Sequence, residues 1–354
     1  AAVSSFFRYK NLLIGRLSFL LFGISAGLAD LQNTRDIPMY SGSYYGYWKN
    51  LEFGYTAVAQ FFNQMGVSFS TFRFIFIVTI FLLFGYGVGL LTTDVSLVAI
   101  YYGCSNFFID YIQYRYAAAV VLTILGLGIL SKHNSLRARF VASLLILCAA
   151  TFHSVALLFF ALYWVAILLR PRSMKTLFLA SVLLSALSFV TETKGHTLFL
   201  TLVVKLASVF NFRSNLAANL SNVYSQGSSF SQWLTFFILG WMILALVFKR
   251  YSYTNQEPLS RFLSIYIVLL LLSTFLLTTI SIDYERIFRF TFLLFTILIL
   301  YPKNKLHVPQ LPLFDVYFLR VLVLFMSFLS CWAHLRVYGL NFEMVAKSLR
   351  IFGF

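Results

Sequence analysis

The chain has 354 residues, of which 60% are hydrophobic and only 11% are charged, and its mean hydropathy is +0.84. This composition excludes a water-soluble globular protein and indicates a membrane protein with many spans, folded as a single integral domain over residues 1–354. The net charge is +16. In a membrane protein basic loops set the topology and contact membrane lipid, so nucleic-acid binding is not expected.

Apolar runs alternate with polar or basic turns along the chain, which predicts an all-α fold with about eleven transmembrane helices, in a range of about 10–13. Two longer polar segments, 30–70 and 191–229, are expected on the outer side. The second has an apolar middle, 197–210, that we interpret as an interfacial helix, and a mobile polar tail that includes Tyr224. The predicted spans are 11–29, 71–91, 95–109, 116–130, 140–150, 155–169, 174–190, 230–248, 262–282, 287–301 and 314–334.

The first candidate site lies around Arg115 and His153. Cationic short loops beside membrane helices face the cytoplasm, so the basic turns at 131–139 and 170–175 should both lie inside. Only 32 residues, 138–169, are available between them, whereas two full spans would need about 20 residues each. We therefore expect two short helices that meet near His153, below the outer surface, with Arg115 at the outer end of the preceding helix.

An arginine and a histidine would then flank one outward-facing cleft, where charge is costly and therefore suggests a site. His153 has two interpretations. A lone histidine can simply hydrogen-bond across a pair of helices. A neutral imidazole in a polar cleft can instead take a proton from a hydroxyl near pH 7.

A second cationic pair, Arg286 and Arg289, is spaced i, i+3 at the start of a predicted helix and shares one face. Arginine binds phosphate oxygens through two parallel hydrogen bonds even where water is scarce, so these residues and Arg115 together predict an anion site. The alternative interpretation is an ion pair with Asp283 or Glu285.

The first outer segment is dense in aromatic rings and also holds two acids, Asp36 and Glu52. An interfacial aromatic belt is one interpretation of the rings, but flat aromatic faces beside carboxylates also suit sugar rings. Either acid could orient a substrate or act as a base, or could simply pair with Arg35 or Lys49. The candidates for orienting a substrate are Asp36, Glu52, Tyr40, Tyr55 and Tyr224.

The sequence lacks the motifs of several kinds of chemistry. Cys104, Cys148 and Cys331 are odd in number and have no CxxC spacing, so neither a disulfide framework nor a metal site is expected, and no cofactor is expected either. We find no P-loop, GxGxxG, HExxH or GxSxG motif, and no cleavable signal peptide. Any phosphate in the reaction should therefore arrive on a lipid.

The order of these features resembles a known family. An outer loop with Asp36 and Tyr40 is followed by E-x-G-Y at 52–55, by an arginine opening a small-residue helix (RYAAAVVLTILGLGIL), by the F-H-S step around His153, and by Arg286 or Arg289. This order is similar to the EpsG-like branch of the Wzy O-antigen and exopolysaccharide polymerases over about residues 30–300. One departure is that Tyr116 and Ala117 follow Arg115, where the family often has R-Q-G or R-Q-x.

The resemblance implies a metal-independent, GT-C-like glycosyltransferase of the bacterial inner (cytoplasmic) membrane. Such enzymes move a growing glycan from undecaprenyl diphosphate onto the non-reducing end of a lipid-linked repeat unit at the periplasmic face. Arg115, Arg286 and Arg289 would hold the donor diphosphate, and His153 would orient or deprotonate the acceptor hydroxyl. The implied partners are an undecaprenyl-diphosphate-linked oligosaccharide, membrane lipid and a chain-length regulator.

Two other classes use a similar outer cleft. An O-antigen ligase or a membrane acyltransferase would carry the same arginines but require a separate acceptor. A non-enzymatic transporter of lipid-linked oligosaccharide would move the anion without forming a bond, although such proteins tend to show internal repeats that this sequence lacks.

Overall fold

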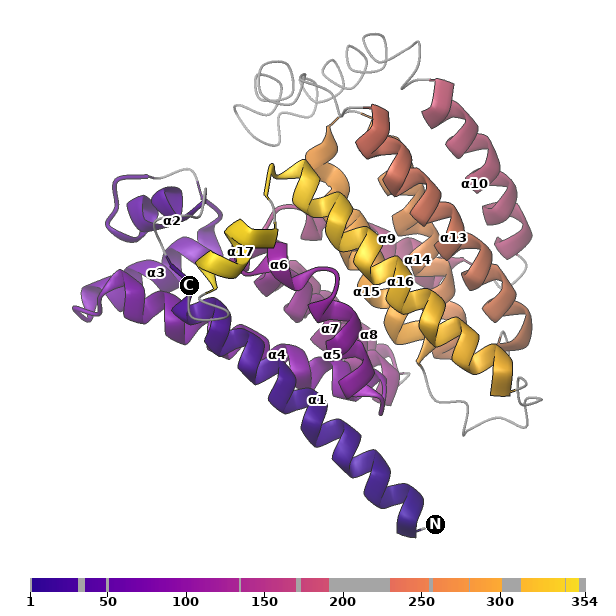
Figure 1. Ribbon diagram of the computed structural model, residues 1–354, viewed down its shortest axis with the longest axis horizontal. Helices are drawn as coiled ribbons and strands as arrows, with labels where there is room; N and C mark the ends of the chain where they lie inside the picture. The colour runs from indigo at the N-terminus through magenta and orange to yellow at the C-terminus, as the bar shows by residue number, and fades with distance from the viewer. Residues whose placement is uncertain are drawn as a thin grey trace. The chain divides into compact units, whose positions relative to one another are not determined.

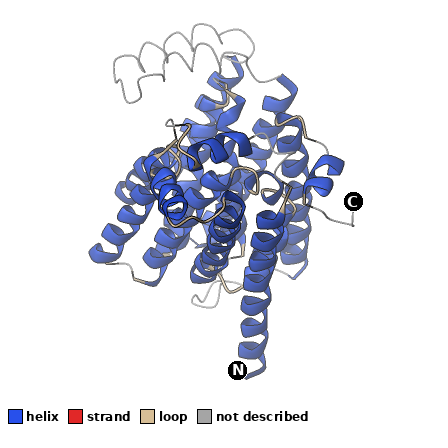
Figure 2. Cartoon of the chain, turned by 90° about the vertical axis from the view of Figure 1, so that its left-hand side faces the viewer, coloured by secondary structure: helices blue, strands red, loops and turns tan. Residues whose placement is uncertain are grey.

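The computed structural model describes most of the chain as helix. The described residues are 2–30, 36–48, 51–133, 135–169, 173–190, 230–254, 257–279, 281–300, 313–340 and 342–349. These residues contain no strand (Figure 2). The predicted all-α class of a polytopic membrane protein is therefore confirmed. The predicted segment 191–229, with Tyr224, lies outside the described residues.

The chain divides into two compact units, 1–164 with 296–354, and 165–295. The helices of the first unit are α1 (Ala2–Leu28), α2 (Ile37–Tyr44), α3 (Phe53–Gln64), α4 (Phe69–Leu91), α5 (Val95–Gly103), α6 (Phe107–Asp110), α7 (Tyr114–Lys132), α8 (Leu136–Ala150), most of α9 (Ala156–Leu168), α16 (Leu313–Val337) and α17 (Phe342–Ser348) (Figure 1). The second unit holds α10 (Ser173–Val190), α13 (Phe230–Thr254), α14 (Pro258–Leu277), the short η2 (Ile282–Tyr284) and most of α15 (Glu285–Ile299). Whether both units form one integral domain stays a prediction.

Six described helices are long and apolar enough to cross a membrane, and two further apolar helices are shorter. The six are 11–28, 69–91, 114–132, 230–251, 258–277 and 318–337, and the shorter ones are 156–168 and 174–190. Each lies on a predicted apolar run, which confirms the positions of these helices. The total of about eleven spans, the GT-C-like arrangement and the choice of outer side stay predictions.

The first unit is built on a chain of helix contacts in which α1 packs on α4, α4 on α7, and α7 on α8. Small residues allow the close approach of α7 to α8: a Cβ on Gly126 would lie 3.0 Å from the carbonyl oxygen of Ala142. Small-residue contacts of this kind drive helix association in membranes, where the hydrophobic effect between helices is weak. The α7–α8 pair therefore forms a closely packed hairpin, and the candidate site lies at one end of it.

Three hydrogen bonds hold the carboxy-terminal end of α1. The buried guanidinium of Arg73, from α4, donates to the carbonyl oxygens of Gly27 and Ala29, where α1 ends. A cation is favourable at a helix C-terminus because the last carbonyl groups lack partners. The carbonyl of Ser348, at the end of α17, accepts the N–H of Asp30 at 2.8 Å, and its hydroxyl bonds the buried Tyr111 hydroxyl at 3.1 Å. Helix α17 thus links the end of α1 to the turn before α7.

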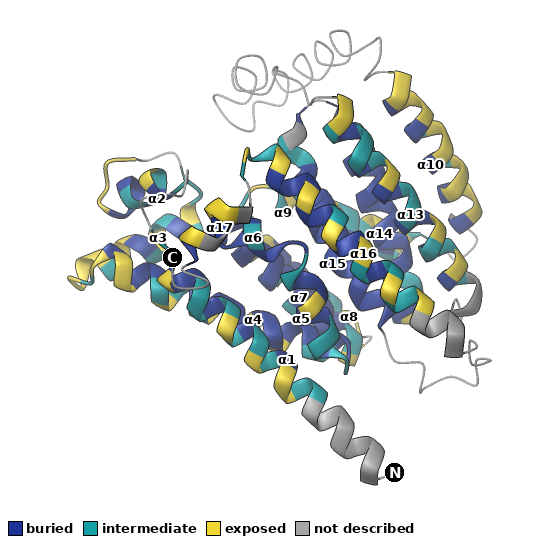
Figure 3. Ribbon diagram, in the orientation of Figure 1, coloured by how far each residue is buried: buried dark blue, intermediate teal, exposed yellow. Residues whose placement is uncertain are grey.

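In the second unit, α14 packs against both α10 and α13. Gly240 of α13 makes one of these contacts close, because a Cβ there would lie 2.5 Å from the ring of Phe275 on α14. Helices α14 and α15 are buried along most of their length, whereas α10 keeps an exposed apolar face (Figure 3). The exposed apolar face of α10 suits contact with lipid.

One expectation needs correction. The predicted span 95–109 is not one helix, because α5 ends at Gly103 and α6 begins only at Phe107. Nine residues of α5 rise about 14 Å, too little to cross a bilayer. The polar side chains at the break explain it: Ser105 bonds the Tyr101 carbonyl, and buried Asp110 accepts the Tyr102 hydroxyl at 2.9 Å. The segment 30–70, which is predicted to lie on the outer side, contains α2 and α3 among its described residues.

Candidate active site at the end of the α7–α8 hairpin

The hairpin geometry brings Arg115 and His153 to the same end of the first unit. Arg115 lies in the first turn of α7, and His153 is the third residue after the end of α8. Helix α8 ends at Ala150 and α9 begins at Ala156, so two short helices meet at 151–155, as the length of the segment predicts. The basic turn after Lys132 lies at the opposite end of α7.

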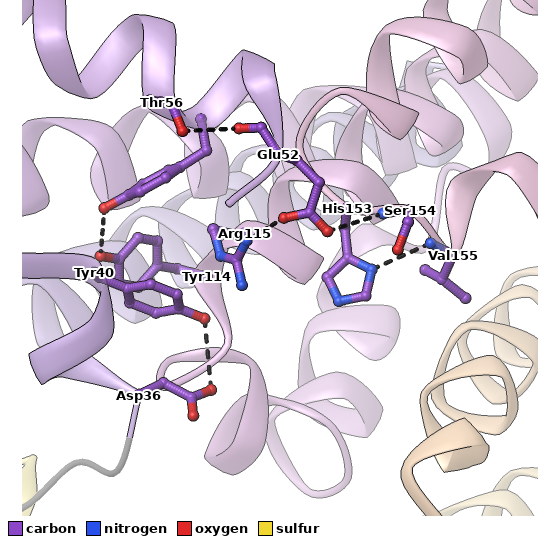
Figure 4. A network of polar contacts seen from close by, with 10 residues as sticks. Asp36, Tyr40, Glu52, Thr56, Tyr114, Arg115, His153, Ser154 and Val155 are labelled. Atoms are coloured by element: carbon purple, nitrogen blue, oxygen red, sulfur yellow. Dashed lines mark hydrogen bonds and ion pairs between the residues drawn. The ribbon is translucent and has the colours of Figure 1, made fainter. Parts of the chain in front are cut away.

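Glu52 is the residue that connects these groups, and Figure 4 shows its carboxylate between Arg115 and Ser154. One oxygen forms an ion pair with Arg115 Nη1, and the other accepts the backbone N–H of Ser154 at 3.3 Å. The Arg115 side chain is 10% exposed and that of Glu52 is 17% exposed. The pair is therefore largely desolvated but still reachable from solvent. Glu52 thus has a long-range partner, 63 residues further along the chain. The alternative partners Arg35 and Lys49 lie outside the described residues.

Close backbone packing fixes where Glu52 points. It stands directly before α3 in an extended conformation, and its side chain does not cap that helix. The next residue but one, Gly54, donates its N–H to the Thr151 carbonyl at 2.7 Å. A Cβ on Gly54 would lie 2.1 Å from Thr151 Oγ1, so only glycine permits this approach. The start of α3 is thereby held against the α8–α9 break.

Tyrosine rings surround the Arg115 guanidinium. Its central carbon lies 4.9 Å from the centre of the Tyr40 ring and 5.8 Å from that of Tyr55, a cation–π arrangement. The Tyr55 and Tyr114 hydroxyl oxygens are 3.1 Å apart. Burial raises the pKa of Tyr55 well above its ordinary value of 10.0, so it stays a neutral phenol. Tyr40 and Tyr55 are buried against Arg115; that they also orient a substrate stays a prediction.

Asp36 reaches this cluster only through Tyr40. Its Oδ2 accepts the Tyr40 hydroxyl at 3.5 Å, at the start of α2 (Figure 4). Of the two acids predicted to orient a substrate, Glu52 is the one that contacts Arg115 directly, whereas Asp36 supports a ring that contacts it.

His153 has a defined ring orientation. Its Nδ1 accepts the backbone N–H of Val155 at 3.3 Å, and its ring meets that of Tyr116 edge-on with 5.6 Å between ring centres. Because Nδ1 is the acceptor, the neutral ring carries its proton on Nε2. The α8–α9 break therefore presents two consecutive backbone N–H groups, at Ser154 and Val155, to ionisable side chains.

The other predicted cations lie in the second unit. Arg289 is fully buried and forms an ion pair with Glu285, with 3.2 Å between Nε and Oε2, as the alternative interpretation of this arginine expects. Arg286 is only partly buried. Whether Arg286 and Arg289 act on the same diphosphate as Arg115 stays a prediction. Among the described residues, no group of three or more His, Cys, Asp or Glu could hold a metal ion.

Sequence reasoning missed the roles of three residues here. Gly54 and Thr151 form the close contact beneath Glu52, and the buried Arg73 supports the end of α1. Gly54 lies within the E-x-G-Y step, where an isolated glycine next to a helix start was the available signal for close backbone approach.

Fold and site together define a polytopic helical membrane protein with a partly accessible arginine–carboxylate pair beside a histidine. The model of the EpsG family matches residues 15–343, so the chain belongs to the EpsG family, a family of Wzy-like polysaccharide polymerases. This confirms the resemblance seen in the sequence. Neither the curated proteins nor the solved structures contain a match to this chain.

Proposed function

We propose that this protein is an O-antigen-type polysaccharide polymerase of the bacterial inner membrane. It transfers a growing glycan from undecaprenyl diphosphate to the non-reducing end of a lipid-linked repeat unit at the periplasmic face. The observation that carries the proposal is the placement of Arg115 and His153 at one end of the α7–α8 hairpin in a member of the EpsG family.

Each group at the site has a role in this proposed reaction. The bond between the sugar's anomeric carbon and the diphosphate oxygen breaks, and the diphosphate leaves with the electron pair. The guanidinium of Arg115 stabilises the charge that develops on this leaving group, because arginine can bind two phosphate oxygens at once. His153, with its proton on Nε2, donates a hydrogen bond that orients a substrate oxygen.

The remaining predicted residues have supporting roles in the proposal. Arg286, which is partly buried, is better suited to contact a ligand than Arg289, which is fully buried against Glu285. Tyr40 and Tyr55 hold the Arg115 guanidinium in position through cation–π contacts, and Asp36 accepts a hydrogen bond from Tyr40. No cofactor is required, because the lipid diphosphate is itself an activated donor.

The test uses the full-length protein in lipid bilayers. The substrates are lipid-linked repeat units extracted from cells that lack this protein. Wild-type protein should produce a ladder of glycan lengths without any added acceptor. Arg115→Ala and His153→Ala should give none, whereas the exposed residues His133 and Arg137 supply matched controls, His133→Ala and Arg137→Ala, that keep the ladder. Transfer only to a separate acceptor would indicate a ligase, and passage across the bilayer without bond formation would indicate a transporter.

A further inference from the structure

The candidate site already contains an anion supplied by the protein. The two oxygens of Glu52 bind the Arg115 guanidinium and the Ser154 backbone N–H. A guanidinium and a backbone N–H freed by a helix break are the same two kinds of ligand that bind a phosphate group. Glu52 therefore occupies the position at Arg115 that the donor diphosphate requires.

The geometry of this contact favours exchange. Arg115 and Glu52 come from segments that are 63 residues apart, so no shared helix holds them together. Both side chains keep some exposure, 10% and 17%, so an incoming ligand can reach them. A diphosphate brings more negative charge than one carboxylate and can engage the planar guanidinium bidentately, so it can compete for Arg115.

We propose that Glu52 is the base that accepts the proton of the acceptor hydroxyl, and that Arg115 holds it inactive until the donor diphosphate displaces it. This inference rests on the proposed function. Donor binding would then both secure the leaving group and release the base. The enzyme would gain its base only when an activated sugar is present.

The step balances without any further reactant. The acceptor hydroxyl oxygen attacks the anomeric carbon and forms the new glycosidic bond, while its proton passes to a Glu52 carboxylate oxygen. The bond from the anomeric carbon to the diphosphate oxygen breaks, and its electron pair stays on the diphosphate at Arg115. Glu52 returns its proton to water and pairs with Arg115 again when undecaprenyl diphosphate leaves.

The other ionisable groups of the cluster are less suited to this role. His153 uses Nδ1 to accept the Val155 N–H, so Nε2 carries the proton of the neutral ring and acts as a donor. Asp36 contacts Tyr40, one ring away from Arg115. Burial raises the pKa of Tyr55 well above its ordinary value, so this phenol does not accept a proton as a phenolate at neutral pH. Glu52 is the carboxylate of this cluster that touches both Arg115 and the α8–α9 break.

The decisive experiment compares binding and turnover in Glu52→Gln. This variant removes the charge that competes for Arg115 and also removes the base. It should bind undecaprenyl diphosphate about 10-fold more tightly, because the Glu52 carboxylate no longer competes with the diphosphate for Arg115. Its kcat for chain extension should fall about 10²- to 10⁴-fold, the usual contribution of a general base. Weaker binding, or an unchanged kcat, would overturn the proposal, since a residue that only positions Arg115 would lose both together.

A matched control is available on α17. Glu343 is exposed and pairs with Lys347 at the surface, so Glu343→Gln should change neither binding nor kcat. If Glu52→Gln is not recovered as a monodisperse protein, difference infrared spectroscopy on the wild type gives the answer. Adding undecaprenyl diphosphate should shift a carboxylate stretching band, and this shift should be absent in Arg115→Ala; an unshifted band in the wild type would overturn the proposal. Failure of the polymerase assignment is distinguishable, because the wild type itself would then give no ladder.

Discussion

The molecule contains two arginine–glutamate pairs that differ in almost every respect. Arg289 and Glu285 are four residues apart on α15 and both are 0% exposed. Arg115 and Glu52 come from α7 and from the residue before α3, and both keep some exposure. In the first pair one helix sets the distance between the partners, whereas in the second the packing of three segments does so.

This difference indicates which pair has a structural role and which pair can exchange its partner during the reaction. Removing one partner from a fully buried pair leaves a charge without compensation, so such a pair is costly to break and poorly suited to open during turnover. A pair that keeps some exposure can exchange its carboxylate for a ligand anion. We therefore expect the Arg289–Glu285 pair to support the fold and the Arg115–Glu52 pair to take part in the reaction.

The largest effect should come from Glu285→Ala. It removes the carboxylate that pairs with the buried Arg289, so stability should fall by about 3–5 kcal/mol. Thermal unfolding in detergent micelles measures the change. The double variant Glu285→Leu with Arg289→Leu should recover most of the lost stability, and a double variant as unstable as Glu285→Ala would contradict a purely structural role for this pair.

Arg115→Lys should act on the reaction more than on the fold. Lysine keeps the positive charge but loses the planar fork, so chain extension should slow by about 10²- to 10³-fold, as when one oxyanion-binding donor is removed. Single-turnover transfer from a lipid-linked donor gives the rate. Arg137→Lys, at an exposed position at the other end of the hairpin, serves as the control. A rate near that of the wild type would place the diphosphate elsewhere.

Gly54→Ala tests the packing beneath Glu52. The new methyl group would meet Thr151 at 2.1 Å, so the start of α3 must move away from the α8–α9 break. Overpacking of this kind usually costs about 1–3 kcal/mol, and here it should also reduce chain extension. Adding Thr151→Gly removes the two side-chain atoms of the clash and should restore part of both properties, because the new methyl group would still lie 2.9 Å from the backbone carbonyl oxygen of residue 151. Gly66→Ala is not a suitable control. Gly66 has open space around it, but its φ of 73° disfavours alanine without any clash.

The smallest expected effect is that of Tyr55→Phe. It removes the hydroxyl contact with Tyr114, which should cost about 0.5–1.5 kcal/mol. Because burial raises the pKa of Tyr55, the unfolded chain releases this proton at a lower pH than the folded protein does. Wild-type stability should therefore fall as pH rises above about 10, and part of that fall should be missing in Tyr55→Phe. Equal slopes in both proteins would contradict the buried neutral phenol.

Much of the fold could be predicted because few backbone structures are stable inside a membrane. Long apolar runs must be helical, since no water is available to satisfy their backbone groups. Loop charge and length together predict a break near His153, because 32 residues between two basic loops that are both expected inside are too few for two full spans. Segment 95–109 was harder, because hydropathy does not register that Ser105 and Asp110 find local hydrogen-bond partners.

The site was only half predictable. Arg115 and His153 could be brought together because both lie on one hairpin, whose ends the loop charges fix. Glu52 lies in a polar segment with no apolar periodicity, and its partner is 63 residues away. Nothing local indicates that pairing. The contact depends on the missing side chain of Gly54, and sequence patterns do not show which backbone a glycine will touch.

The position of α17 has a practical consequence for handling this protein. Ser348 accepts the N–H of Asp30 and bonds the hydroxyl of Tyr111, so the helix closes over groups from the end of α1 and from the turn before α7. A shortened version of the chain without α17 would expose these buried groups a few residues from Arg115. Activity lost when α17 is removed should therefore first be checked as a folding defect.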